Sequence, residues 1–189
     1  AQSVIGREIR EQSMEQEGRL PNMLIACCGG GSNLIGMIHE FLDEPEIIKI
    51  GVEAAETAAL SNGTPGIMQG MKTYMLQTDD GSKSLGGSSL GAGIQYFSVG
   101  PQHAFLKDQG VVKYTSATDK EILEAYKLIA STEGICSALE PMAGAAELIK
   151  QAKNKPKDYL ICLNLCGTGE KDLNTIQEHI GKDFEWKIR

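Results

Sequence analysis

The sequence predicts an α/β fold in which helices cover both faces of a mostly parallel, twisted sheet. Short apolar runs, which are typical of buried strands, alternate along the chain with longer segments of helical periodicity. Glycine-rich turns follow the first and the last of these runs, and ligands of parallel sheets bind at such strand ends. The 189 residues are expected to form a single domain, residues 1–189, with a core of its own.

The apolar patterning places each element in order. Helices are expected at about 3–16, 33–42, 119–132, 138–153 and 172–180, and strands at 23–27, 46–54, 111–117 and 158–166. Asp119 is a candidate cap for the third helix, and Pro141 fits the first turn of the fourth. Residues 55–100 are rich in glycine, serine and threonine with weak periodicity. They form either a linker or, as long loops in compact domains often do, part of a site.

Composition excludes several classes of protein. Hydrophobic residues make up 41% and charged residues 23%, which is ordinary for a globular chain. The net charge of −7 argues against a nucleic-acid partner, because phosphate backbones bind basic faces. No apolar run approaches the roughly 18 residues of a membrane span. The charged, amphipathic start is neither a signal peptide nor a transit peptide, so we expect a cytoplasmic protein without a membrane partner.

The cysteines point to the same compartment. Four of the five, Cys27, Cys28, Cys162 and Cys166, lie in or beside apolar runs. Their spacing does not match a zinc site, and the three histidines are far away in the sequence. We therefore expect these cysteines to be small buried apolar residues in a protein of a reducing compartment.

The stretch "CCGGGSN" (27–33) is the strongest local signal for a ligand. It joins a predicted strand to a predicted helix, and its glycines leave backbone N–H groups uncovered. These groups, together with those of the first helical turn, can bind an anion, and Ser32 and Asn33 can add side-chain donors. Phosphate is the expected ligand, and the alternative is a tight turn that binds nothing. The spacing matches neither a dinucleotide-binding motif nor a P-loop.

A second glycine turn, Gly167–Gly169 in "LCGTGEKD", follows the last predicted strand. Because the carboxyl ends of parallel strands share one edge of the sheet, the two turns could hold two ends of one flat phosphorylated cofactor.

The chain also resembles a known family. The segments "EGRLPNMLIACCGGGSNLIG", "GVEAAE", "YFSVGPQHAFL", "EGICSALEPMAGAAE" and "LNLCGTGEKD" together resemble the tryptophan synthase β subunit, a fold-type-II enzyme. The similarity runs from about residue 2 to residue 180 but covers only the C-terminal half of that subunit. The chain has no initiator methionine and opens directly in a helical pattern, so we expect a trimmed chain or a missing upstream segment.

The resemblance implies a reaction and its partners. The family uses pyridoxal 5′-phosphate to replace the hydroxyl of L-serine by indole, which makes L-tryptophan. It also implies a monovalent cation, Na or K, an α-type partner subunit and a β–β dimer.

The resemblance also implies residue roles. Phosphate would be held by Gly29, Gly30, Gly31, Ser32 and Asn33. Glu140 matches a glutamate beside the cofactor ring, and Cys166 falls where the family usually has a serine that faces the pyridine nitrogen. The backbone carbonyls of Gly29, Tyr96 and Ser98 match the cation site.

This sequence lacks or replaces several residues that the family uses. The family's lysine that binds the cofactor covalently, in a His-Lys-Thr-Asn context, has no counterpart here, nor has its acidic catalytic residue. Gln95 stands where the family has an aspartate that closes the site over serine. The chain alone is therefore expected to be inactive. One alternative is a non-catalytic domain that binds the cofactor or a partner; another is a related β-replacing enzyme with a different acceptor.

Some residues allow two interpretations. Cys166 could be a reactive thiol at a helix N-terminus or a buried packing cysteine that replaces serine, and a ring-facing role with little nucleophilicity is favoured. Glu140 is either a site carboxylate or an ordinary first-turn glutamate. His103 could serve acid–base chemistry, but a structural or substrate-tunnel role is favoured. We expect His39 and His179 at the surface, and Lys171 as a solvated lysine at the start of a helix.

Overall fold

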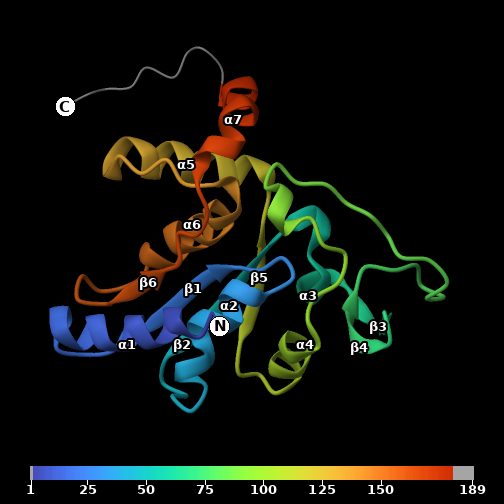
Figure 1. The fold of residues 1–189 in the computed structure, drawn as a ribbon, viewed down its shortest axis with the longest axis horizontal. Coiled ribbons are helices and arrows are strands. Elements are labelled where there is room, and N and C mark those ends of the chain that lie inside the picture. The colour runs from blue at the N-terminus through green and yellow to red at the C-terminus, as the bar shows by residue number, and fades with distance from the viewer. Residues whose placement is uncertain (1, 181–189) are drawn as a thin grey trace.

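A four-stranded parallel sheet forms the centre of the molecule, with the strand order β5-β2-β1-β6. The computed structural model describes residues 2–180, and Figure 1 shows its arrangement. The strands are β1 (Met23–Cys27), β2 (Ile48–Ala54), β5 (Lys113–Ala117) and β6 (Ile161–Leu163), with a separate hairpin of β3 (Thr64–Met68) and β4 (Met71–Met75). The helices are α1 (Val4–Glu17), α2 (Ser32–Ile38), α3 (Ala59–Asn62), α4 (Pro101–Asp108), α5 (Asp119–Glu133), α6 (Leu139–Ala152) and α7 (Leu173–Ile180).

Helices cover both faces of the sheet, as the sequence predicted. α5 and α6 pack on one face, whereas α1, α2 and α4 lie on the other. The central strand β1 is buried along its whole length. Its side chains alternate, so that Ile25 and Cys27 point into the α5–α6 core and Ala26 and Cys28 into the opposite core. A continuous apolar run is what a parallel strand buried on both faces requires.

The register brings the strand ends to one edge. Ile25 of β1 pairs with Ile50 of β2 on one side and with Leu163 of β6 on the other. All pairings in this sheet are parallel, so the segments that follow β1, β2 and β6 leave from the same side. The two outer strands are shorter than predicted, because the sheet pairs only residues 113–117 and 161–163 of the runs at 111–117 and 158–166.

The cap of α5 differs from the prediction. Thr118 caps this helix, and its side chain and that of Glu121 form a reciprocal capping box. Asp119, the predicted cap, is the first helical residue. Its carboxylate accepts hydrogen bonds from the Ser89 hydroxyl at 2.8 Å and from the Leu90 N–H at 3.1 Å. Asp119 therefore anchors a distant loop to the helix.

The stretch 55–100 is more ordered than predicted. It contains α3 and the antiparallel hairpin β3–β4, which projects from the side of the molecule. The hairpin was missed because the apolar residues of its strands do not alternate regularly with polar ones and most of its residues are not buried. The last part of the stretch, near residues 93–96, returns to the sheet edge beside the first glycine turn.

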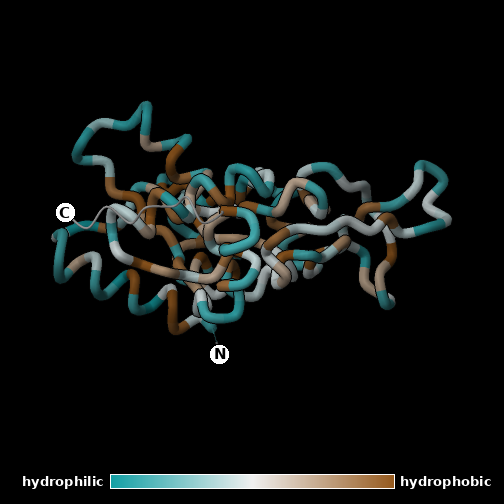
Figure 2. Tube along the Cα trace, turned by 90° about the horizontal axis from the view of Figure 1, so that it is seen from above, coloured by the Kyte–Doolittle hydropathy of each residue, from teal (hydrophilic) through white to brown (hydrophobic). Residues whose placement is uncertain are grey.

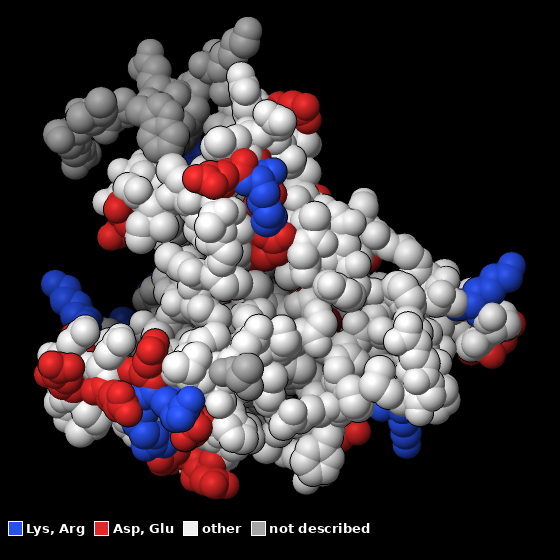
Figure 3. All heavy atoms as spheres, viewed as in Figure 1, with Lys and Arg blue, Asp and Glu red and all other residues white. Residues whose placement is uncertain are grey.

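Hydrophobic residues gather in the middle of the molecule, whereas the loops that project at its ends are mainly hydrophilic (Figure 2). On the face that Figure 3 shows, acidic and basic side chains are intermixed near the rim and the middle carries few charges. None of the helices among residues 2–180 is both long and apolar enough to cross a membrane.

Candidate functional site

The first glycine turn joins β1 to α2 and is packed tightly at both ends. A side chain at Gly29 would place its Cβ 2.7 Å from the Gly93 carbonyl oxygen, and one at Gly31 would place its Cβ 2.1 Å from the His103 ring. Gly31 also has a φ of +97°, a left-handed conformation that glycine adopts without strain. At Gly30, by contrast, a Cβ would meet no atom within 4 Å. The turn is wedged at its ends and open in the middle.

The polar groups of this turn fall into two sets. The Gly31 carbonyl accepts hydrogen bonds from His103 Nε2 at 2.7 Å and from the Ile35 N–H at 3.0 Å. The Gly30 carbonyl accepts from the Gly100 N–H at 3.3 Å. Within residues 2–180, no backbone acceptor meets the N–H groups of Gly30 and Gly31, and no side chain caps the start of α2. The carbonyls thus face the protein, which leaves the donors for an anion.

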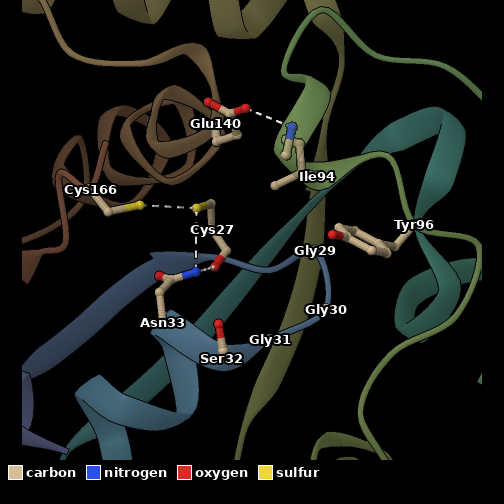
Figure 4. A pocket seen from close by; sticks show the side chains of 11 residues that line it. Cys27, Gly29, Gly30, Gly31, Ser32, Asn33, Ile94, Tyr96, Glu140 and Cys166 are labelled. Carbon is tan, nitrogen blue, oxygen red and sulfur yellow. Dashed lines mark hydrogen bonds between the residues drawn. The ribbon is translucent and has the colours of Figure 1, made fainter. Parts of the chain in front are cut away.

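A pocket of about 290 Å³ lies beside the turn (Figure 4). This volume is close to the lower end of the range for small-molecule sites. Its lining residues come from segments far apart in the sequence: Cys27, Gly29, Gly30, Gly31, Ser32, Asn33, Gly93, Ile94, Tyr96, Glu140 and Cys166. The pocket thus brings together every predicted cofactor-binding residue, Glu140, and Tyr96 of the predicted cation site. Ser98 lies outside the lining and forms an isolated β-bridge with Met75.

The two side chains after the glycines behave differently. The Asn33 amide donates a hydrogen bond to the Cys27 carbonyl at 3.0 Å and accepts one from Asn164 at 3.1 Å. It therefore ties α2 to the ends of β1 and β6. Ser32 is exposed beside the open side of the turn, where its hydroxyl can meet a ligand.

Glu140, in the first turn of α6, is a buried and paired carboxylate. Its Oε1 accepts hydrogen bonds from the Gly93 N–H at 2.6 Å and from Lys171 Nζ at 2.8 Å. Burial opposes ionisation, but the hydrogen bonds from Lys171 and Gly93 outweigh it and hold the pKa of Glu140 below its usual value. Lys171 is exposed, as predicted, but it also pairs with Asp172 at 2.8 Å, so it is an ion-paired lysine as well as a solvated one.

The second glycine turn does not share the pocket, contrary to the prediction that both turns hold one ligand. A Cβ at Gly169 would lie 2.5 Å from the Cys136 carbonyl oxygen, and one at Gly167 would lie 3.0 Å from Ala138. The turn therefore packs against the segment that leads into α6. Asp172, just beyond it, accepts the Leu139 N–H at 2.8 Å and so caps that helix. From this part of the chain, only Cys166 lines the pocket.

Cys166 lies beside the thiol of Cys27, for which the sequence predicted only a buried packing role. Its Sγ is 3.8 Å from the Sγ of Cys27 at the end of β1. The hydrogen bond from Cys27 lowers the pKa of Cys166 to about 7, whereas the same contact, together with burial, raises the pKa of Cys27. Of the two thiols, Cys166 therefore ionises more readily, and Cys27 more readily keeps its proton. Because β1 and β6 are neighbours, knowledge of the strand order would have revealed this pair.

His103 is buried behind the glycine turn, in keeping with the structural role that the sequence favoured. Its Nε2 donates to the Gly31 carbonyl, so its Nδ1 accepts from the Tyr114 hydroxyl at 2.8 Å. Burial lowers the pKa of His103 and favours this neutral form. His39 and His179 are exposed, as predicted.

Comparison with known proteins identifies the class that this fold and pocket define. The model of the family described as "Pyridoxal-phosphate dependent enzyme" matches residues 1–167. The chain belongs to this family of pyridoxal-phosphate-dependent enzymes, which confirms the predicted fold type and class of enzyme.

Within this family, the chain is similar to tryptophan synthase beta chains. The chain is 48% identical over 196 residues to the tryptophan synthase beta chain of Dinoroseobacter shibae, covering 99% of this chain and 48% of the relative. It is also 48% identical over 190 residues to the tryptophan synthase beta chain of Rhodopseudomonas palustris, covering 97% of this chain and 47% of the relative. The chain thus spans about half the length of the curated relatives it matches.

Two solved structures share the fold at low identity. An O-ureido-L-serine synthase mutant aligns with a TM-score of 0.69 and 16% identity over 96% of this chain and 50% of its own. A threonine deaminase from T.th. aligns with a TM-score of 0.64 and 18% identity over 88% of this chain and 56% of its own. At these identities the likeness concerns the fold alone.

Proposed function

We propose that this chain is the cofactor-binding domain of a tryptophan-synthase-β-type enzyme, which forms L-tryptophan from L-serine and indole. The observation that carries the proposal is the pocket in which the glycine turn, Glu140 and Cys166 meet. The 48% identity to two tryptophan synthase beta chains supports the reaction type.

The residues of the pocket fit pyridoxal phosphate. The open side of the turn at Gly30 accepts a phosphate, because unused N–H groups gather there and no side chain fills the space. Ser32 adds a hydroxyl, and Asn33 holds α2 against β1 rather than donating to the ligand. When bound, the cofactor acts as the electron sink for chemistry at the β-carbon of an amino acid.

Glu140 and Cys166 are proposed to face the ring of the cofactor. Glu140, held ionised by Lys171, sets the charge of the site and orients polar groups of the ligand. Cys166 takes the position facing the pyridine nitrogen, where its sulfur can exchange a hydrogen bond with the ring.

Covalent attachment is proposed to need residues outside this chain. No lysine is among the residues that line the pocket within residues 2–180. Lys171 approaches it but is engaged by Glu140 and Asp172. This supports our division into a cofactor-binding domain, residues 1–189, and a separate domain that supplies the lysine.

Three finer features belong to the same proposal. The backbone carbonyls of Gly29, Tyr96 and Ser98 would hold a monovalent cation, and the approach of the 93–96 segment to Gly29 supports the first two. An α-type subunit and a second β-type chain are the proposed partners. The proposed location is the cytoplasm, in keeping with five free cysteines.

The test is a titration of this chain with pyridoxal phosphate, followed by borohydride reduction and peptide mass mapping. Saturable binding without a reduced lysine is expected. A stoichiometric adduct at one lysine would contradict the proposed division of the enzyme, and no binding would contradict the cofactor site.

A matched pair of variants locates the phosphate. Gly30→Asp places a negative charge on the open side of the turn and should weaken binding at least roughly tenfold, because like charges repel. Gly86→Asp makes the same change where a Cβ also meets no atom within 4 Å, but outside the pocket lining. Equal effects of both variants would place the phosphate elsewhere.

A different acceptor is a second candidate. Gln95 replaces the family's aspartate, and its amide donates to the Ser89 carbonyl, which fixes it to the neighbouring loop. A panel of nucleophilic acceptors, tested with an enzyme completed by its missing domain, distinguishes indole from its rivals.

A further inference from the structure

We propose that Cys27 and Cys166 form a redox-active dithiol, which closes reversibly to a disulfide in the wall of the cofactor pocket. The disulfide does not depend on the proposed function; only its effect on the cofactor rests on it. Figure 4 shows the two sulfur atoms facing each other between the end of β1 and the segment after β6.

The two thiols lie close together at the ends of neighbouring strands. The two Sγ atoms are 3.8 Å apart, so they must approach by roughly 1.8 Å to reach the bond length of a disulfide. The neighbouring strands hold the two thiols in place, because Ile25 pairs with Leu163 just before them. The Asn33 amide lies 3.7 Å from the Cys27 sulfur and fixes that side chain toward the pocket. Closure therefore requires Cys166 to move toward a Cys27 sulfur that is held in place.

Cys166 is both accessible and chemically reactive. Both cysteines line the pocket, and Cys166 is only half-buried, so a small oxidant can reach it. The contact with Cys27 favours the thiolate at Cys166, and the thiolate is the form that reacts with peroxides. Cys28 lacks both properties, because it is buried in the opposite core.

The chemistry balances with a hydroperoxide as the oxidant. The Cys166 thiolate attacks one peroxide oxygen, which forms an S–O bond, breaks the O–O bond and releases hydroxide, or an alkoxide from an organic peroxide. The Cys27 sulfur then attacks the sulfenic sulfur of Cys166, which forms the S–S bond and releases the oxygen as water with the Cys27 proton. Two thiols lose two electrons in total. A small dithiol restores both by exchange.

Closure would change the pocket chemically. It removes the thiolate that faces the ring and draws Cys166 toward β1. Because the ring loses a hydrogen-bonding partner, the oxidised chain should bind pyridoxal phosphate about tenfold more weakly or worse.

The experiment treats the chain with hydrogen peroxide and measures its intact mass and its disulfide peptides before and after dithiothreitol. A Cys136→Ser background removes the exposed thiol that would otherwise react alone. A loss of about 2 Da, a linked peptide pair containing Cys27 and Cys166, and full reversal are expected.

Two variants make the test specific. In Cys28→Ser, the neighbour on the opposite face of β1 is changed and the loss of about 2 Da should persist. In Cys166→Ser, the loss of about 2 Da should disappear. A disulfide that joins other cysteines, or an unchanged mass under conditions that modify a free thiol, would overturn the proposal.

Cofactor titration of the reduced and oxidised forms separates the two proposals. Weaker binding after oxidation supports the redox control, whereas equal binding with the disulfide formed overturns it. If the reduced chain binds no pyridoxal phosphate, the proposed function fails while the mass data still decide the dithiol.

Discussion

The two glycine turns of this chain are similar in composition but differ in what lies on their open side. At the first turn, Gly29 and Gly31 are wedged against the protein while Gly30 opens into the pocket. At the second turn, Gly167 and Gly169 pack against the segment before α6, and neither lines the pocket. Glycine in a turn after a strand therefore predicts close approach, but the approaching group is either a ligand or the protein itself.

The largest expected effect separates two glycines of the first turn. Gly31→Ala forces a Cβ into the His103 ring at a φ of +97°, so the free energy of unfolding should fall by roughly 3 kcal/mol. Gly30→Ala, in open space, should change it by less than about 0.5 kcal/mol. Chemical denaturation measures both values. Similar losses at the two positions would show that the turn is not wedged as described.

The second turn should separate stability from binding. Gly169→Ala places a Cβ 2.5 Å from the Cys136 carbonyl and should lower the free energy of unfolding by roughly 1–3 kcal/mol. The affinity of the folded fraction for pyridoxal phosphate should not change, because Gly169 lies outside the pocket lining. Calorimetric titration well below the melting temperature tests this. A large loss of affinity at full folding would give the second turn a share in the site.

The smallest effect concerns pH. Burial lowers the pKa of His103, so the unfolded chain binds a proton at this residue more readily than the folded chain. Its contribution is complete above about pH 6.5 and falls as the pH drops below that value. In His103→Gln, which keeps a donor for the Gly31 carbonyl, we expect this part of the pH dependence to vanish. Unfolding curves from pH 5 to 8 measure it, and an unchanged slope would assign the dependence to other groups.

The sequence was most informative where one element carries its own signal. β1 was predicted at its observed bounds, because a continuous apolar run between polar residues has few alternatives. The predicted bounds of α5 and α6 differ from the observed bounds by at most one residue at each end, since the apolar residues of these helices repeat at helical spacing. The hairpin β3–β4 was missed because pairing with each other, rather than burial, defines its strands.

The residues of the site were likewise predictable where a local pattern or the family resemblance marked them, and their long-range contacts were not. The glycine turn and its expected ligand came from local spacing, and Glu140 and Cys166 came from the family resemblance. The Cys27–Cys166 contact and the Lys171–Glu140 ion pair were not foreseen, because each joins residues that only the strand order and helix packing bring together. Thr118 displaced Asp119 as a cap because the reciprocal bonds with Glu121 require a residue three positions earlier.

The position of β6 in the sheet has a consequence for the folding of this protein during its synthesis on the ribosome. β1, β2 and β5 can pair soon after residue 117 emerges, but β6 joins the free side of β1 only after residues 161–163 have been made. Until then the pocket lacks Cys166, which lines it opposite the end of β1. The complete set of pocket residues is thus present only after Cys166 has been made. The nascent chain must therefore complete a long-range pairing step, β1 with β6, before the pocket is whole.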